Sequence, residues 1–155
     1  MALQNYHNIL VPVDGSENAL RALDYAASLA EAAELQILLL HVAQMGPVEM
    51  MKALGYPAAA REDAARRTSD LEELRRELAE HVFQAARERL PENLQVRQMM
   101  VAGDPARVIL EQVDKLGNAV IVMGNRGLSE VRELLIGGVS SKVLHHASCP
   151  VTIVR

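Results

Sequence analysis

Short apolar runs alternate along this chain with longer segments in which apolar residues recur at helical spacing. The runs expected to form strands are rich in β-branched and aliphatic residues and lie at residues 8–13, 35–42, 94–101, 119–123 and 151–154. The segments expected to form helices lie at residues 20–33, 69–90, 104–117 and 139–147. Strands that alternate with helices need right-handed crossovers, which favour parallel pairing. The pattern therefore predicts an α/β fold with an open parallel sheet and helices on both faces.

Two helix starts carry capping signals. Asp104 is expected to cap a helix whose first residue is Pro105, and Gly117 is expected to end that helix. The sequence Ser-Asp-Leu-Glu at residues 69–72 matches a capping box, in which the Ser hydroxyl and the Glu carboxylate each accept a backbone N–H.

The remaining segments differ in how clearly they can be interpreted. Residues 119–123 are continuously apolar and predict a buried strand. Residues 94–101 alternate over part of their length and predict an edge or half-exposed strand. Residues 45–68 predict a long connection, with helical turns as an alternative. The charged run 61–89 predicts a solvated helix face.

Length and composition limit the classes of protein. The 155 residues fit a single domain over 1–155, since domains usually hold about 100–200 residues. A hydrophobic fraction of 50% with 23% charged residues excludes general disorder. The net charge of −4 gives no sign of a basic face, and the absence of Trp, with one Phe and three Tyr, leaves few stacking platforms, so no nucleic-acid partner is expected.

Three features predict a cytoplasmic protein. The longest apolar run, at 35–42, is far shorter than the roughly 20 residues of a membrane-spanning helix, so no membrane association is expected. Residues 1–7 lack the basic and apolar regions of a signal peptide. The one cysteine, Cys149, cannot form an internal disulfide, which suits a reducing compartment.

Two segments are expected at the edge where open α/β sheets bind ligands, beyond the carboxyl ends of the strands. Asp14-Gly15-Ser16 follows the first strand, and Gly124-Asn125-Arg126-Gly127 follows the fourth. Nine residues later, Gly137 and Gly138 precede a predicted helix. Such glycines let backbone N–H groups face an anion, and Arg126 adds a charged donor. The alternative is a tight connection that needs glycine for its backbone angles and binds no ligand.

Several other candidate sites are less favourable. Adjacent histidines on a helix diverge by about 100°, so His145 and His146 are poor metal co-ligands, and no metal site is predicted. Cys149 is expected to be a small buried apolar residue rather than a nucleophile. Asp14 either caps the first helix or contacts a ligand or metal. No general base or activated nucleophile is identified, so no catalytic residue is predicted.

Four motifs occur in a characteristic order and spacing: I-L-V-P-V-D-G-S at 9–16, His41-Val42, V-M-G-N-R-G at 122–127, and H-A-S-C-P-V-T-I-V at 146–154. With them the chain resembles the universal stress protein family over essentially its full length. The resemblance implies the Rossmann-like adenine nucleotide α-hydrolase fold, with five parallel strands in the order 3-2-1-4-5. It also implies an ATP site of the form G-x2-G-x9-G-[S/T].

The resemblance assigns a nucleotide site to positions of this chain. The adenosine would meet Pro12, Val13, Asp14, Val42 and Met123, and the phosphates would meet Gly124, Arg126, Gly127, Gly137, Gly138, Val139 and Ser140. Asp14 would hold the ribose or, through Mg²⁺, the phosphates.

The sequence departs from the motif at one position, since Gly138 stands where the motif has Ser or Thr. Without this hydroxyl, the affinity for ATP should be roughly 10- to 150-fold lower, because a hydrogen bond to a charged group contributes about 1.5–3 kcal/mol. Ser140 or Ser141 could compensate in part.

The resemblance implies a stress-response factor, regulatory or protective, that binds ATP, with or without Mg²⁺, and is not an efficient enzyme. Hydrolysis or self-phosphorylation would at most be slow. The ligand could also be AMP or a cyclic nucleotide. One alternative is a nucleotide-free dimeric interaction module of the same family. The other is an adenylate-using enzyme or electron-transfer subunit, whose S-G-G-x-D-S motif is absent after the first strand.

The last strand is the expected dimer contact. As the final strand of the sheet it would expose unpaired backbone groups together with apolar side chains, a surface that is usually paired or covered. The family commonly dimerises there, so a homodimer is expected through Val151, Thr152, Ile153 and Val154.

Overall fold

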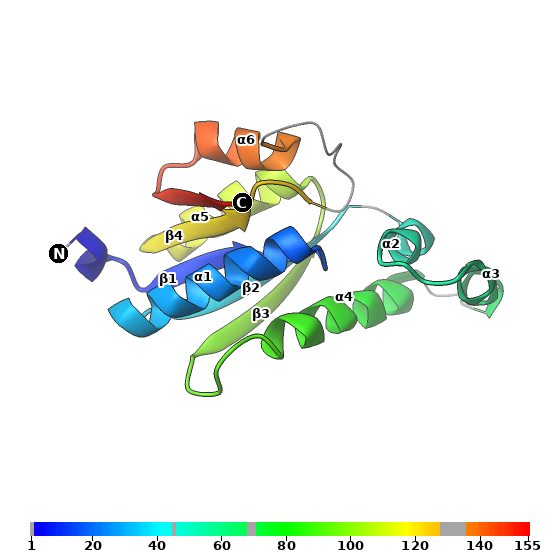
Figure 1. The fold of residues 1–155 in the computed structure, drawn as a ribbon. Helices are drawn as coiled ribbons and strands as arrows, with labels where there is room; N and C mark the ends of the chain where they lie inside the picture. The colour runs from blue at the N-terminus through cyan, green and yellow to red at the C-terminus, as the bar shows by residue number, and fades with distance from the viewer. Residues whose placement is uncertain (1, 45, 68–70, 128–135) are drawn as a thin grey trace.

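The computed structural model describes residues 2–44, 46–67, 71–127 and 136–155 (Figure 1). Within them a five-stranded sheet has the order β3-β2-β1-β4-β5, and all neighbouring strands are parallel. Its strands are β1 (Asn8–Pro12), β2 (Gln36–Ala43), β3 (Val96–Ala102), β4 (Ala119–Gly124) and β5 (Val151–Val154). The predicted open parallel sheet and its order 3-2-1-4-5 are confirmed.

Helices cover both faces of the sheet (Figure 1). Helices α1 (Glu17–Ala33) and α4 (Leu71–Arg87) pack on one face, and α5 (Pro105–Leu116) and α6 (Gly138–His146) pack on the other. Successive strand residues point to opposite faces. Ile9 and Val11 therefore join the core beneath α1 and α4, whereas Leu10 joins the core beneath α5 and α6.

The connection after β2 is largely helical. Helix α2 (Pro47–Ala53) begins with a proline, and the Gly46 N–H donates to the Glu49 carboxylate at 3.0 Å. Helix α3 (Ala58–Arg67) consists mainly of Ala, Arg and Glu, which are strong helix formers. The helical alternative for residues 45–68 is therefore the correct one over these two spans.

The element ends follow local chemistry. The expected cap of α5 is confirmed, because Asp104 Oδ1 accepts the Arg107 N–H at 3.0 Å. Strand β3 pairs only with β2 in the described sheet and is half-exposed, as predicted for an edge strand. Of the predicted capping box, residues 69 and 70 lie outside the described residues.

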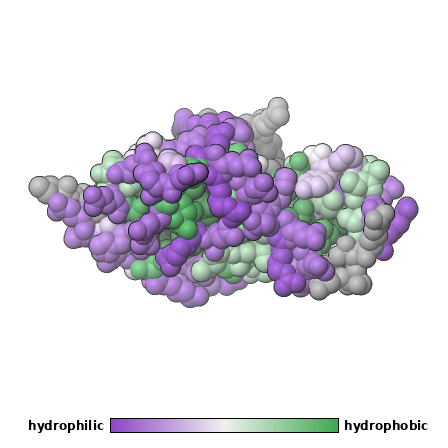
Figure 2. All heavy atoms as spheres, turned by 90° about the horizontal axis from the view of Figure 1, so that it is seen from below, coloured by the Kyte–Doolittle hydropathy of each residue, from purple (hydrophilic) through white to green (hydrophobic). Residues whose placement is uncertain are grey.

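Within the charged run 61–89, the described side chains of α4 form a solvated helix face, as predicted. The carboxylates and guanidinium groups along the outer side of α4 are mostly exposed, while Leu74, Leu78 and Val82 are buried against the sheet. The face seen from below in Figure 2 is accordingly mainly hydrophilic, with apolar atoms gathered in small areas between hydrophilic ones. None of the described helices has the length and apolar character needed to cross a membrane.

Candidate functional site

A cleft lies beyond the carboxyl ends of the strands and encloses about 840 Å³, including its solvent-filled mouth. Its walls combine apolar strand ends with the segments that follow β1 and β4. Every residue assigned to the nucleotide site from the sequence lines it except Gly137 and Gly138: Pro12, Val13, Asp14, Val42, Met123, Gly124, Arg126, Gly127, Val139 and Ser140.

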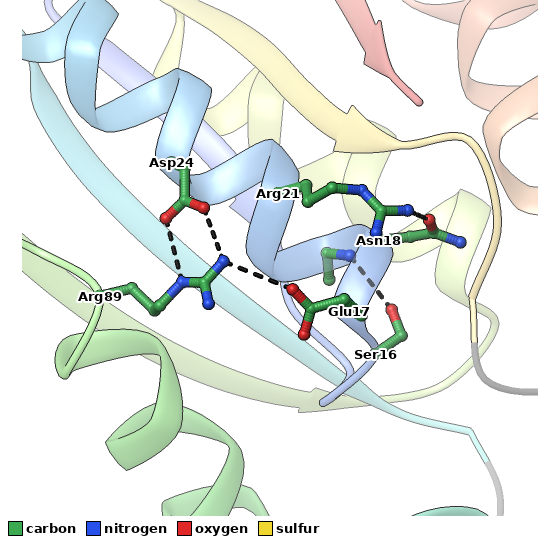
Figure 3. A network of polar contacts seen from close by, with 7 residues as sticks. Ser16, Glu17, Asn18, Arg21, Asp24 and Arg89 are labelled. Atoms are coloured by element: carbon green, nitrogen blue, oxygen red, sulfur yellow. Dashed lines mark hydrogen bonds and ion pairs between the residues drawn. The ribbon is translucent and has the colours of Figure 1, made fainter.

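The turn after β1 places a carboxylate at the cleft. Asp14 Oδ1 accepts the Ser16 N–H at 2.9 Å. Ser16, drawn in Figure 3, in turn accepts the Ala19 N–H through its Oγ at 3.2 Å. The cap of α1 is therefore Ser16, so of the two alternatives for Asp14 the capping role is wrong, and contact with a ligand or metal stays a prediction. The physical reason is that a capping oxygen accepts the N–H of the second or third residue of the helix, whereas Asp14 accepts that of Ser16, which precedes the helix.

The glycines after β4 have two different roles. A Cβ atom on Gly124 would lie 2.9 Å from the Asn18 carbonyl oxygen of α1, so Gly124 allows β4 to approach this helix. A Cβ atom on Gly127 would lie 2.7 Å from Asp14 Oδ2, so a side chain there would displace the Asp14 carboxylate. Neither glycine has a positive φ, so the structural alternative based on backbone angles is wrong for both. Gly124 serves close packing, whereas Gly127 keeps room for a carboxylate that lines the cleft.

Helix α6 is anchored to the end of β4 by two hydrogen bonds. The Gly137 N–H donates to the Asn125 carbonyl at 2.6 Å, and the Ser140 hydroxyl donates to the Gly124 carbonyl at 2.7 Å. The sequence had suggested that Ser140 could replace the hydroxyl that Gly138 lacks. Because a hydroxyl has only one proton to donate and that of Ser140 is already engaged, Ser140 cannot do so. A Cβ atom on Gly138 would meet no other atom within 4 Å.

The start of α6 also supplies a positive potential. The first N–H groups of an α-helix lack acceptors within the helix, and its dipole adds partial positive charge there. Val139 and Ser140, in the first turn of α6, line the cleft. Among the described lining residues, the charged side chains are Asp14 and Arg126. This end of the cleft is therefore polar, with one cation and one anion.

His41 lines the cleft at the end of β2 and is 2% exposed. Its Nδ1 lies 2.8 Å from the Val13 carbonyl oxygen, which can only accept a hydrogen bond, so Nδ1 carries the proton. Burial lowers the pKa of His41, while the hydrogen bond to Val13 and the charge of Asp14 act in the opposite direction. The ring is therefore neutral at pH 7.

An ionic contact links the end of α4 to the first turns of α1. Arg89 donates through two nitrogens to Asp24, at 3.1 and 2.6 Å, and forms an ion pair with Glu17 at 3.5 Å (Figure 3). These groups are solvent-exposed, so each pair contributes little to the free energy of unfolding. The contact connects two helices of one face next to the turn that carries Asp14.

The histidine pair and the cysteine lie away from this cleft. His145 and His146 are exposed, and their Nδ1 atoms contact backbone carbonyls one turn earlier, as expected for surface residues. Cys149 is half-buried, and burial followed by the charge of Asp114 raises the pKa of its thiol. Within the described ranges, no group of three or more His, Cys, Asp or Glu residues could hold a metal ion.

The cleft also has walls that sequence reasoning did not identify. Pro105 and Ile109 come from the start of α5, which follows the end of β3, so the same strand-end rule would have found them. Gln44 and Met50 come from the connection after β2, whose conformation has no clear sequence signal. The other unpredicted lining residues are Ala19, Leu40 and His41.

The comparisons with known proteins agree with this fold. The family model described as "Universal stress protein family" matches residues 5–155. The universal stress protein YxiE of Bacillus subtilis is 30% identical over 154 residues, covering 97% of this chain and 99% of that protein.

Two solved structures share the architecture. UspA from Lactobacillus plantarum has a TM-score of 0.72 at 26% identity, covering 97% of this chain and 98% of the other. A universal stress protein from Archaeoglobus fulgidus, described as a complex with dAMP, has a TM-score of 0.62 at 19% identity, covering 97% and 98% of the two chains. On the family match and the identity to YxiE, this chain belongs to the universal stress protein family.

Proposed function

We propose that this chain binds ATP reversibly in the cleft at the strand ends and acts as a regulatory or protective stress-response factor in the cytoplasm. The observation that carries the proposal is the cleft itself, which joins apolar strand ends to the glycine-rich segment after β4. A related protein of the same fold is described as a complex with dAMP, which supports an adenine nucleotide as the ligand class.

The residues suit the two chemical halves of the ligand. Val13, Val42 and Met123 offer apolar contact to an adenine ring. Arg126 and the start of α6 offer positive charge to phosphates. Asp14 has the chemistry to accept from a ribose hydroxyl or to contact Mg²⁺, which proteins usually bind through one or two carboxylates and the phosphates of the substrate.

Catalysis is not part of this proposal. Asp14 and the neutral His41 are the titratable acid–base groups among the described lining residues. The one proton on the His41 ring is donated to the Val13 carbonyl, and the other nitrogen, Nε2, is buried away from the cleft solvent. Hydrolysis or self-phosphorylation would then be slow at most. A turnover in the range of about 1–10³ s⁻¹, which is usual for enzymes, would contradict the proposal.

Calorimetric titration of the purified chain with Mg²⁺-ATP tests the proposal. We expect saturable binding at one site per chain, weakened about tenfold or more in Arg126→Gln, because a hydrogen bond to a charged group contributes about 1.5–3 kcal/mol. Arg66→Gln is the matched control, since Arg66 lies exposed on α3 and should leave binding unchanged. Absence of binding to the unmodified chain would contradict the proposal.

The nucleotide-free interaction module is a second candidate that one observation favours. Gly138 supplies no hydroxyl, and the Ser140 hydroxyl already donates to Gly124. If the unmodified chain binds no nucleotide but Gly138→Ser does, this second candidate replaces the first. Protection of the backbone amides at the cleft would then be the same with and without ATP.

We also propose that the chain forms a homodimer through β5. Its four residues, Val151, Thr152, Ile153 and Val154, are all half-buried at the edge of the described sheet. On α6, which packs against β5, Leu144 is an exposed large apolar residue. Val154→Lys should shift sedimentation toward the monomer, whereas Met99→Lys on the opposite edge strand should not. Monomers of the unmodified chain at micromolar concentration would contradict this proposal.

A further inference from the structure

His41 is a polar side chain in an otherwise apolar part of the core. Its ring packs edge-on against Phe83 of α4, with centroids 6.2 Å apart and planes at 84°. Its Nε2 atom is buried and has no hydrogen-bond partner among the described residues. Burying an unpaired polar atom is unfavourable, so packing alone would favour an apolar side chain at this position. What the imidazole provides is the hydrogen bond from Nδ1 to the Val13 carbonyl.

That carbonyl lies where the sheet ends and the cleft begins. Strand β1 ends at Pro12, and the Val13 N–H still donates to the Leu40 carbonyl at 2.9 Å. The Val13 carbonyl accepts from the side chain of His41, which follows Leu40 in β2, at 2.8 Å. The peptide group between Val13 and Asp14 contains this carbonyl, so its orientation is held by His41.

Asp14 transmits this orientation to the cleft. Its Oδ1 accepts the Ser16 N–H at 2.9 Å, and its Oδ2 lies close to Gly127. Rotation of the preceding peptide would move the carboxylate away from both. We propose that His41 is a positioning residue of the cleft, which holds the Val13–Asp14 peptide so that the Asp14 carboxylate faces the glycine-rich segment after β4.

The effect on nucleotide affinity rests on the function proposed above, whereas the effect on the Asp14 turn does not. His41→Asn and His41→Leu are the decisive pair, since their side chains have nearly the same size and shape. The Asn amide nitrogen takes the position of Nδ1 and can donate to the Val13 carbonyl, but Leu cannot. A merely structural role predicts that Leu serves as well as Asn or better, because the site is apolar. A positioning role predicts the opposite order.

Two readouts separate these cases. In His41→Leu we expect the affinity for Mg²⁺-ATP to fall about three- to tenfold below that of His41→Asn, the usual range for one neutral hydrogen bond. We also expect the Ser16 amide, which donates to Asp14, to exchange its hydrogen faster in His41→Leu than in His41→Asn or the unmodified chain. Phe83→Leu controls for general loosening, because it removes the ring contact and leaves the hydrogen bond in place.

Equal Ser16 exchange in the Asn and Leu variants would overturn the inference, as would equal losses in His41→Leu and Phe83→Leu. The two proposals can fail separately. If the unmodified chain binds no ATP, the proposed function fails, and Ser16 exchange still decides the role of His41. If the unmodified chain binds ATP and His41→Leu binds it as tightly as His41→Asn, the positioning role fails alone.

Discussion

The two ends of the cleft are held in place by different interactions. The apolar end, formed by Pro12, Val13, Val42 and Met123, consists of strand termini that continue the two cores of the sheet. The glycine end, formed by Gly124, Gly127, Val139 and Ser140, depends on hydrogen bonds between backbone and small side chains.

This difference determines how substitutions should act. Side chains at the apolar end are part of the core, so truncating them should lower the free energy of unfolding. Residues at the glycine end have little side chain to lose, so added atoms matter there, through steric conflict or through new donors to a ligand.

The largest effect is expected at the apolar end. Met123 is 4% exposed, and Met123→Ala should lower the free energy of unfolding by about 2–5 kcal/mol, the range for truncating a buried large apolar side chain. Met99→Ala is the matched control on the edge strand β3, where Met99 is 39% exposed, and should change this free energy by about 0.5 kcal/mol or less. Urea unfolding measures both free energies. Similar losses in the two variants would contradict the view that the apolar end of the cleft belongs to the core.

At the glycine end, an added methyl group should lower the free energy of unfolding at one glycine and leave it nearly unchanged at another. Gly124→Ala places a Cβ atom 2.9 Å from the Asn18 carbonyl oxygen and should cost about 1–3 kcal/mol of unfolding free energy, as overpacking does. Gly138→Ala meets open space and should cost about 0.5 kcal/mol or less. Equal stability of the two variants in urea would show that β4 does not depend on this close approach.

A hydroxyl at the glycine end should act on binding rather than on stability. Gly138→Ser should tighten Mg²⁺-ATP binding about tenfold, because the new hydroxyl can donate to phosphate while that of Ser140 is already engaged. Gly138→Ala adds the same Cβ atom without a donor and should bind like the unmodified chain. Calorimetry compares the three, and a gain in the Ala variant would assign the effect to the backbone.

The smallest effect is a pH dependence from His41. Burial lowers its pKa in the folded state below the ordinary value of 6.5, so below that pH the unfolded chain binds more protons than the folded chain. The free energy of unfolding should therefore fall as pH decreases from about 6.5. Above about pH 7.5, His41 should cause no pH dependence of this free energy. Urea unfolding of the unmodified chain and His41→Asn at pH 7.5 and 5.5 isolates the contribution. A larger loss in the variant would contradict it.

Sequence periodicity was sufficient to predict where the strands lie, because each strand is buried on both faces or has the pattern of an edge strand. Residues 119–123 are an example, since β4 is buried throughout. The resemblance gave the strand order, which periodicity alone does not contain. Only part of the lining of the cleft followed from the ends of β1 and β4 together with the resemblance.

Three features could not be predicted because they depend on contacts between distant segments. The role of Gly124 depends on the approach of α1, and the engagement of Ser140 depends on where the Gly124 carbonyl lies. The wall supplied by Met50 depends on the folding of α2 over the turn after β1. None of these leaves a periodic signal in the sequence.

Backbone hydrogen exchange with and without Mg²⁺-ATP tests most directly whether this cleft is the nucleotide site. We predict that ATP slows exchange at residues 124–127 and 138–140, while exchange in α3 on the far side of α2 stays the same. Unchanged exchange at these cleft amides, or protection confined to another surface, would contradict the proposed nucleotide site.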